Sequence, residues 1–101
     1  MSRWARNLKS LLSYGRGREE RLTLDEARSA VKAVINSPEV LQSPLSGRIL
    51  GLSYEALDAL ENGNAVKASV RMDMAYSSGC GALEVDTAYR YLKHYCRQEN
   101  I

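Results

Sequence analysis

Residues 23–35 carry the strongest folding signal in the sequence, a helix start followed by a regular apolar face. Thr23-Leu24-Asp25-Glu26 matches a capping box, in which the Thr23 hydroxyl accepts from the Glu26 amide and the Glu26 carboxylate accepts from the Thr23 amide. The apolar residues that follow at helical spacing are Leu24, Ala27, Val31, Val34 and Ile35. We therefore expect a helix that lies on the core and ends before Pro38.

Prolines and glycines divide the rest of the chain into short segments. Ser37-Pro38 and Ser43-Pro44 each place a capping hydroxyl before a proline suited to a first helical turn, so each predicts a short helix. Ser53 begins a further predicted helix, which Gly63 ends. A closing helix is expected from about residue 84 to 98. Its predicted core stripe is Val85, Ala88, Tyr89, Leu92, Tyr95 and Cys96.

Between residues 66 and 76 the pattern changes to strict alternation. The apolar members are Val66, Ala68, Val70, Met72, Met74 and Tyr76, and polar residues stand between them up to Asp73. Alternation of this kind predicts a half-buried strand, which would pair with residues 48–52, the stretch around Leu83, or a second copy of itself. A helix is the alternative, because Ala, Met, Lys and Arg are good helix formers and Asn64 could cap it.

Length and composition fit one ordinary globular domain. The chain has 101 residues, of which 45% are hydrophobic and 26% charged, so it can build a single core but not two domains. We expect a mainly α to α+β fold with four to five helices, one strand near residues 66–76 and an N-terminal basic amphipathic helix. Residues 1–18 would form a basic arm, and residues 19–101 the globular domain.

The arm is defined by its charge and by an apolar stripe. Residues 1–18 hold five basic residues and no acid, a charge of +5, whereas the remainder holds nine basic and twelve acidic residues, a charge of −3. The stripe consists of Trp4, Leu8, Leu11 and Leu12, at helical spacing. The cations are Arg3, Arg6, Lys9, Arg16 and Arg18. Gly15 and Gly17 predict a flexible joint to the rest of the chain.

Such an arm suits an anionic or partly apolar partner. A basic helix with an apolar face can fill a groove on a partner protein, lie on nucleic acid, or pack against its own domain or a second copy in a homodimer. Contact with a membrane surface is not expected, because one helix of three turns buries little apolar area.

Residues 47–60 resemble a helix-turn-helix in their spacing. Gly47 supplies the small residue of a first helix, Gly51 the turn glycine, Leu52 the apolar residue after it, and Leu57 and Leu60 the anchors of a second helix. The second helix, however, would carry Glu55, Asp58 and Glu61 and no basic residue, which opposes contact with phosphates. The alternative without DNA binding is a helical hairpin that belongs to the core.

Catalysis has little support in the sequence. Cys80 lies in a loop of small residues before the closing helix, where a helix N-terminus could activate a thiol. The single histidine, His94, lies about 15 Å further along that helix at 1.5 Å per residue, so we expect no Cys80–His94 dyad within one chain. Cys80 and Cys96 lack metal-ligand spacing. We therefore predict no enzyme activity, no metal, no cofactor and no small-molecule substrate.

These patterns predict a non-enzymatic regulatory, adaptor or inhibitor-type protein that binds a macromolecule. Its contact residues would be the apolar and basic residues of the arm. The alternative is a small DNA-binding regulator that uses residues 47–60 together with the arm cations and Arg48. No transmembrane run and no secretory signal are apparent, and two cysteines suggest a reduced, cytoplasmic protein.

Overall fold

The helix predicted from the capping box is present in the structure. The computed structural model of the chain describes residues 21–99, and its first described helix, α2, runs over Leu24–Ile35. Thr23 Oγ1 accepts from the Glu26 amide at 3.1 Å, and Glu26 Oε1 accepts from the Thr23 amide at 2.9 Å. Both halves of the predicted box therefore form, and α2 begins at the predicted residue.

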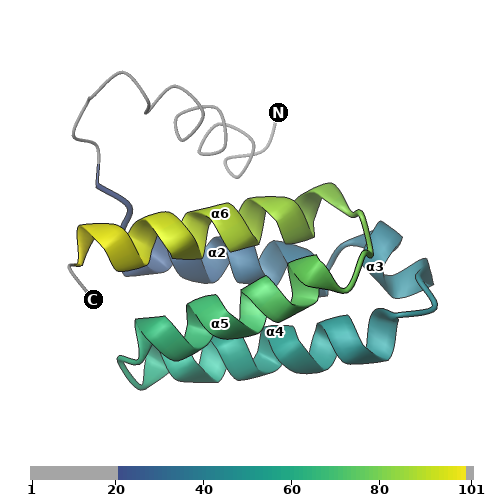
Figure 1. Cartoon of the computed structure of the whole chain (residues 1–101), viewed down its shortest axis with the longest axis horizontal. Coiled ribbons are helices and arrows are strands. Elements are labelled where there is room, and N and C mark those ends of the chain that lie inside the picture. Colours follow the sequence, from purple (N-terminus) through teal and green to yellow (C-terminus); the bar gives the residue numbers. More distant parts are fainter. Residues whose placement is uncertain (1–20, 100–101) are drawn as a thin grey trace.

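The described residues form an all-α domain without strands. The helices after α2 are α3 (Pro38–Gln42), α4 (Ser46–Glu61), α5 (Ala65–Ser77) and α6 (Leu83–Gln98). The four longer helices alternate in direction, and in Figure 1 α2 and α6 form one layer above α4 and α5. In this bundle α4 packs on α2 and α5, and α6 also packs on α2 and α5. Consequently α4 and α6 occupy opposite corners.

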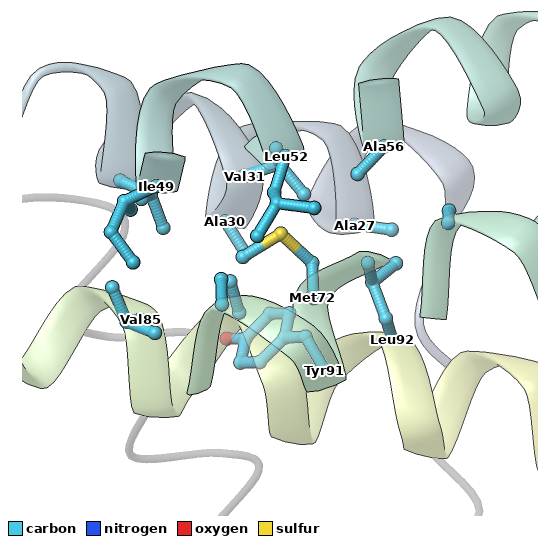
Figure 2. Close-up of a cluster of buried hydrophobic side chains, with 14 of the residues drawn as sticks. Ala27, Ala30, Val31, Ile49, Leu52, Ala56, Met72, Val85, Tyr91 and Leu92 are labelled. Atoms are coloured by element: carbon cyan, nitrogen blue, oxygen red, sulfur yellow. The ribbon is translucent and has the colours of Figure 1, made fainter. Parts of the chain in front are cut away.

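All four longer helices contribute to one apolar core. Figure 2 shows Met72 of α5 lying between Leu52 of α4 and Tyr91 of α6, with Val31 of α2 close by. Met72, Val31 and Tyr91 have no exposed surface, and Leu52 retains 7%. Many other buried positions are alanines, among them Ala27, Ala30, Ala56, Ala68, Ala75 and Ala88. These small side chains let the helices approach closely, so few large side chains are needed to fill the interior.

The strand predicted at residues 66–76 is wrong, because this segment is helix α5. Asn64 Oδ1 accepts from the Lys67 amide at 3.1 Å, which is the cap that the alternative interpretation required. Gly63, predicted to end the preceding helix, adopts a φ of +74° in the turn between α4 and α5. Helix propensity and the cap therefore outweigh the alternation.

The two helices predicted within residues 47–60 are also wrong. Residues 46–61 form one uninterrupted helix, α4, and Gly51 lies inside it rather than in a turn. Ser53 starts no helix: it is fully buried in the middle of α4, where its hydroxyl donates to the Ile49 carbonyl at 2.8 Å. The helix-turn-helix-like element of the DNA-binding alternative is therefore not formed.

The predicted pieces after the two prolines have different outcomes. Pro38 opens α3, capped by the Ser37 hydroxyl, which accepts from the Val40 amide at 3.3 Å. Pro44 instead lies in a turn that leads directly into α4. In α6, Val85, Ala88 and Leu92 are buried as predicted, Tyr89, Tyr95 and Cys96 are half-buried, and Tyr91 is an unpredicted core residue.

The two ends of the described domain lie together. The Leu22 amide donates to Gln98 Oε1 at 2.9 Å, and Gln98 Nε2 donates back to the Leu22 carbonyl. Arg21 forms an ion pair with Glu99 at 3.1 Å. These contacts join the segment before α2 to the end of α6.

Candidate protein-interaction surface

Helix α5 has two apolar faces, and only one of them faces the core. The core face consists of Ala65, Ala68, Met72 and Ala75. The opposite face consists of Val66, Val70 and Met74, which expose 44%, 46% and 38% of their surfaces. We call these three residues the α5 stripe. They recur every four residues, so they form one continuous row of a little over two turns along the outside of the helix.

The hydrogen bonds around α5 fix the direction of the stripe. On the α4 side, Arg71 Nε forms an ion pair with Glu55 Oε1 at 2.6 Å, and Arg71 Nη1 lies 3.8 Å from Met74 Sδ. On the other side, the Cys96 thiol of α6 donates to the Ala65 carbonyl at 3.2 Å. Since α5 is held on both flanks, its remaining face, the α5 stripe, points to solvent.

Polar side chains border the α5 stripe. Lys67 and Asp73 are exposed beside it, and the Ser77 hydroxyl donates to Asp73 at 3.4 Å. An apolar centre within a polar border is the usual composition of a protein-binding patch. Exposed apolar residues are ordinary when isolated, whereas Val66, Val70 and Met74 adjoin one another and so make the α5 stripe a candidate contact surface.

A second feature lies where the loop after α5 meets α6. An open groove of about 560 Å³ is lined by this loop and by side chains that include Tyr76, Leu83, Asp86 and Arg90. Leu83 is 54% exposed, and Arg90 forms an ion pair with Asp86 at 3.0 Å. The hydrogen bond to Asp86 is the largest factor that raises the pKa of Arg90. The groove thus combines an apolar wall with charges of both signs.

Beside this groove the Tyr76 ring stacks on the Tyr89 ring. Their centroids are 4.5 Å apart and their planes differ by 6°. Lys93 Nζ lies 5.4 Å from the Tyr89 centroid and donates to the Tyr89 hydroxyl at 3.3 Å. The stacked pair therefore joins the outer surfaces of α5 and α6 and holds Lys93 close to the helix surface.

The structure places the residues predicted from sequence as follows. The apolar anchors and cations of the arm lie outside the described residues. They are Trp4, Leu8, Leu11, Leu12, Arg3, Arg6, Lys9, Arg16 and Arg18. Arg48 is exposed near the start of α4. Further along α4 the outer side carries exposed Asp58 and Glu61, so Arg48 is not part of a basic surface on this helix.

The two cysteines and the single histidine lie at different places on the bundle. Cys80 is half-buried before α6, whereas His94 lies near the far end of α6. Burial raises the pKa of the Cys96 thiol, and burial together with Arg97 lowers the pKa of His94. Within residues 21–99 no three metal-ligating side chains come together. None of the described helices is long and apolar enough to cross a membrane.

The sequence prediction missed the α5 stripe because alternation has two explanations. Two rows with a spacing of four, offset by two residues, produce the same apolar pattern as a strand. The sequence did contain the distinguishing signal: Asn64 at a capping position, and alanines at 65, 68 and 75, which suit a closely packed helix face. Weighing this signal above alternation would have revealed a helix with an unpartnered apolar row.

Comparison of the chain with protein-family models, with curated proteins and with solved structures found no match.

Proposed function

We propose that this chain is a non-enzymatic regulatory, adaptor or inhibitor-type protein that binds a protein partner through the α5 stripe. The observation that carries the proposal is the exposure of Val66, Val70 and Met74 on one helix face while the opposite face fills the core. A partner helix can lay its own apolar face along such a row, and the polar border would fix its orientation.

The α5 stripe is too small to be a whole interface. Specific interfaces typically involve about 20–30 residues on each side, of which a few buried anchors supply most of the affinity. The arm is the natural source of additional contact. Its apolar anchors would be buried by the partner, and its five cations would face an acidic surface.

A photo-crosslinking experiment tests the α5 stripe directly. A photoreactive amino acid is introduced at position 70, and a control is introduced at exposed Ser29 on α2. We expect a partner that crosslinks from position 70 and not from position 29. If both positions give the same products, or position 70 gives none, the α5 stripe is not the binding site.

Affinity measurements then quantify the contribution of the α5 stripe. The triple variant V66Q/V70Q/M74Q should remain folded, because glutamine is a good helix former and all three positions are exposed. It should bind the crosslinked partner at least about tenfold more weakly, since it removes three apolar anchors. The matched control is L41Q, which changes an apolar residue on α3 that is 53% exposed. Equal affinities for the two variants would contradict the proposal.

Deletion of residues 1–14 tests the arm. The domain should remain folded, because within residues 21–99 the buried core is already contributed by all four longer helices, and the affinity for the partner should fall. Unfolding of the truncated chain would show that the arm belongs to the core. Binding to duplex DNA with a steep dependence on salt would instead support the nucleic-acid alternative.

A further inference from the structure

The outer faces of α4 and α6 carry rows of residues with matching spacing. On α4 the row is Gly51, Tyr54, Asp58 and Glu61, all exposed. On α6 it is Leu83, Asp86, Arg90 and Lys93, exposed except for half-buried Asp86. Both rows advance by three, four and three residues, which is the spacing of helices that pack side by side over several turns. We call them the α4 row and the α6 row.

When the two rows are laid side by side in parallel, first residue against first, each position of the α4 row complements the corresponding position of the α6 row. Gly51 has no atom within 4 Å of the position that a Cβ would take, and Leu83 is 54% exposed, so the Leu83 side chain could be buried against Gly51. One turn on, Tyr54 is 58% exposed and lies level with Asp86, which lines the open groove. The groove can receive the tyrosine ring, and the Asp86 carboxylate can accept from its hydroxyl.

The remaining two levels pair opposite charges. Asp58 stands level with Arg90, and Glu61 stands level with Lys93. Arg90 and Glu61 already bond within their own chain, to Asp86 at 3.0 Å and to Arg28 at 2.9 Å. Their side chains are nevertheless 55% and 57% exposed, and a guanidinium or a carboxylate can serve two partners at once. Lys93 donates to the Tyr89 hydroxyl at 3.3 Å and has two further N–H donors for a second partner.

The geometry points to self-assembly, in which the α4 row of one copy packs in parallel on the α6 row of the next. The bundle permits this arrangement because α4 and α6 occupy opposite corners and run in the same direction (Figure 1). Two copies in nearly the same orientation therefore bring the rows together, and each dimer leaves one row of each kind free. The contact is heterologous, so assembly continues head to tail.

The contact area determines how strong this assembly can be. A single pair of helices in contact over three turns buries less than the roughly 800 Å² per partner of a standard stable interface. Assembly is therefore weak and depends on concentration. Because two of the four levels are ion pairs between exposed groups, it also depends on salt.

Sedimentation of the full chain over a concentration series up to about 1 mM measures this assembly. In about 0.1 M salt we expect the mean mass to rise with concentration. In about 1 M salt, where the screening length falls to about 3 Å, the dissociation constant should increase about fivefold. A chain that stays monomeric throughout the series in 0.1 M salt would overturn the inference.

Charge reversal provides the decisive test. The variants D58K/E61K and R90E/K93E should each be monomeric, because each brings like charges together at two levels of its own contact. An equimolar mixture should assemble again, since the reversed α4 row of the first then faces the reversed α6 row of the second. Circular dichroism confirms that both are folded. Absence of recovery on mixing would overturn the inference.

Two further variants keep this result distinct from the proposed function. G51Q fills the space opposite Leu83 without changing charge, and it should weaken assembly several-fold. This variant tests the contact independently of the charge-reversal variants, in case one of those fails to fold. V66Q/V70Q/M74Q leaves both rows intact and should assemble like the wild type. If this variant is the one that fails to assemble, copies meet through the α5 stripe, and the α4–α6 contact is wrong.

Discussion

Replacing Tyr91 by phenylalanine should leave the domain as stable as the wild type or more stable, and should make it more resistant to alkali. Tyr91 is fully buried on α6, and its hydroxyl has no hydrogen-bond partner among the described residues. A buried hydroxyl without a partner carries its full desolvation cost, about 1–3 kcal/mol. Tyr91→Phe removes that cost and leaves only a small void, so at pH 8 we expect a gain of about 0–1 kcal/mol in the free energy of unfolding.

The pH dependence follows from the tyrosine pKa. Burial, with a smaller contribution from Glu26, raises the pKa of Tyr91 from 10.0 to about 12. The folded state therefore keeps the phenolic proton at a pH where the unfolded chain loses it, so stability is complete below pH 10 and falls as the pH rises towards 12. For these two values, the loss at pH 11 is about 1.4 kcal/mol, and the full loss is about 2.7 kcal/mol.

Urea unfolding followed by circular dichroism at pH 8 and pH 11 measures both effects. The difference in stability between Tyr91→Phe and the wild type should grow by about 1.4 kcal/mol between the two pH values. The control is Tyr54→Phe, which removes a hydroxyl from a ring that is 58% exposed. If wild type and Tyr91→Phe lose the same stability between pH 8 and pH 11, burial of the phenol does not govern its ionisation.

Three further predictions concern the helices and the thiols. Gly51→Ala should raise the free energy of unfolding by up to about 1 kcal/mol, because the added Cβ meets no atom within 4 Å and alanine is the better helix former; an unchanged melting temperature would contradict this. Thr23→Ala should cost about 0.5–2 kcal/mol by removing the cap of α2, and Thr23→Ser should retain most of the stability. Alkylation near neutral pH should be slower at Cys96 than at an unfolded-chain thiol, because burial raises its pKa; equal rates would show that the contact with α5 opens readily.

The sequence predicted a helix end correctly where short-range interactions alone determine that end. The capping box placed α2 correctly because both of its hydrogen bonds join residues three apart, and no distant contact is needed to satisfy them. The end of α4, two residues before Gly63, was predictable for a similar reason, since the glycine adopts a positive φ in the turn that follows.

The prediction failed where a local pattern had two physical solutions. Apolar residues at alternate positions of 66–76 fit one face of a strand, and they also fit two opposite faces of a helix. The local signals that favour the helix are the Asn64 cap and the alanines at 65, 68 and 75, and the alternation hid them. Which face of that helix is buried depends on its packing against α4 and α6, which the sequence does not identify. The turn predicted at Gly51 was wrong for a related reason. Gly47 and Gly51 resemble turn residues, but α4 accommodates both within one helix.

The candidate sites were less predictable than the fold. The sequence drew attention to the arm because its charge is visible without a structure. The α5 stripe and the α4 and α6 rows depend on which side of each helix is buried, which follows only once the helices are placed. The outward direction of Tyr54 and Leu83, for example, is a property of the bundle and not of their neighbours in sequence.

The hydrogen bonds between Leu22 and Gln98 determine how the domain responds when it is held at both ends. The chain enters and leaves at the same pole, beside the start of α2 and the end of α6. A pulling force on the two ends of the domain would therefore unzip α6 from α2, starting at Leu22 and Gln98. It would not shear the two helices along their length. For the same reason, the domain could be inserted into a loop of another protein without forcing the ends of that loop apart.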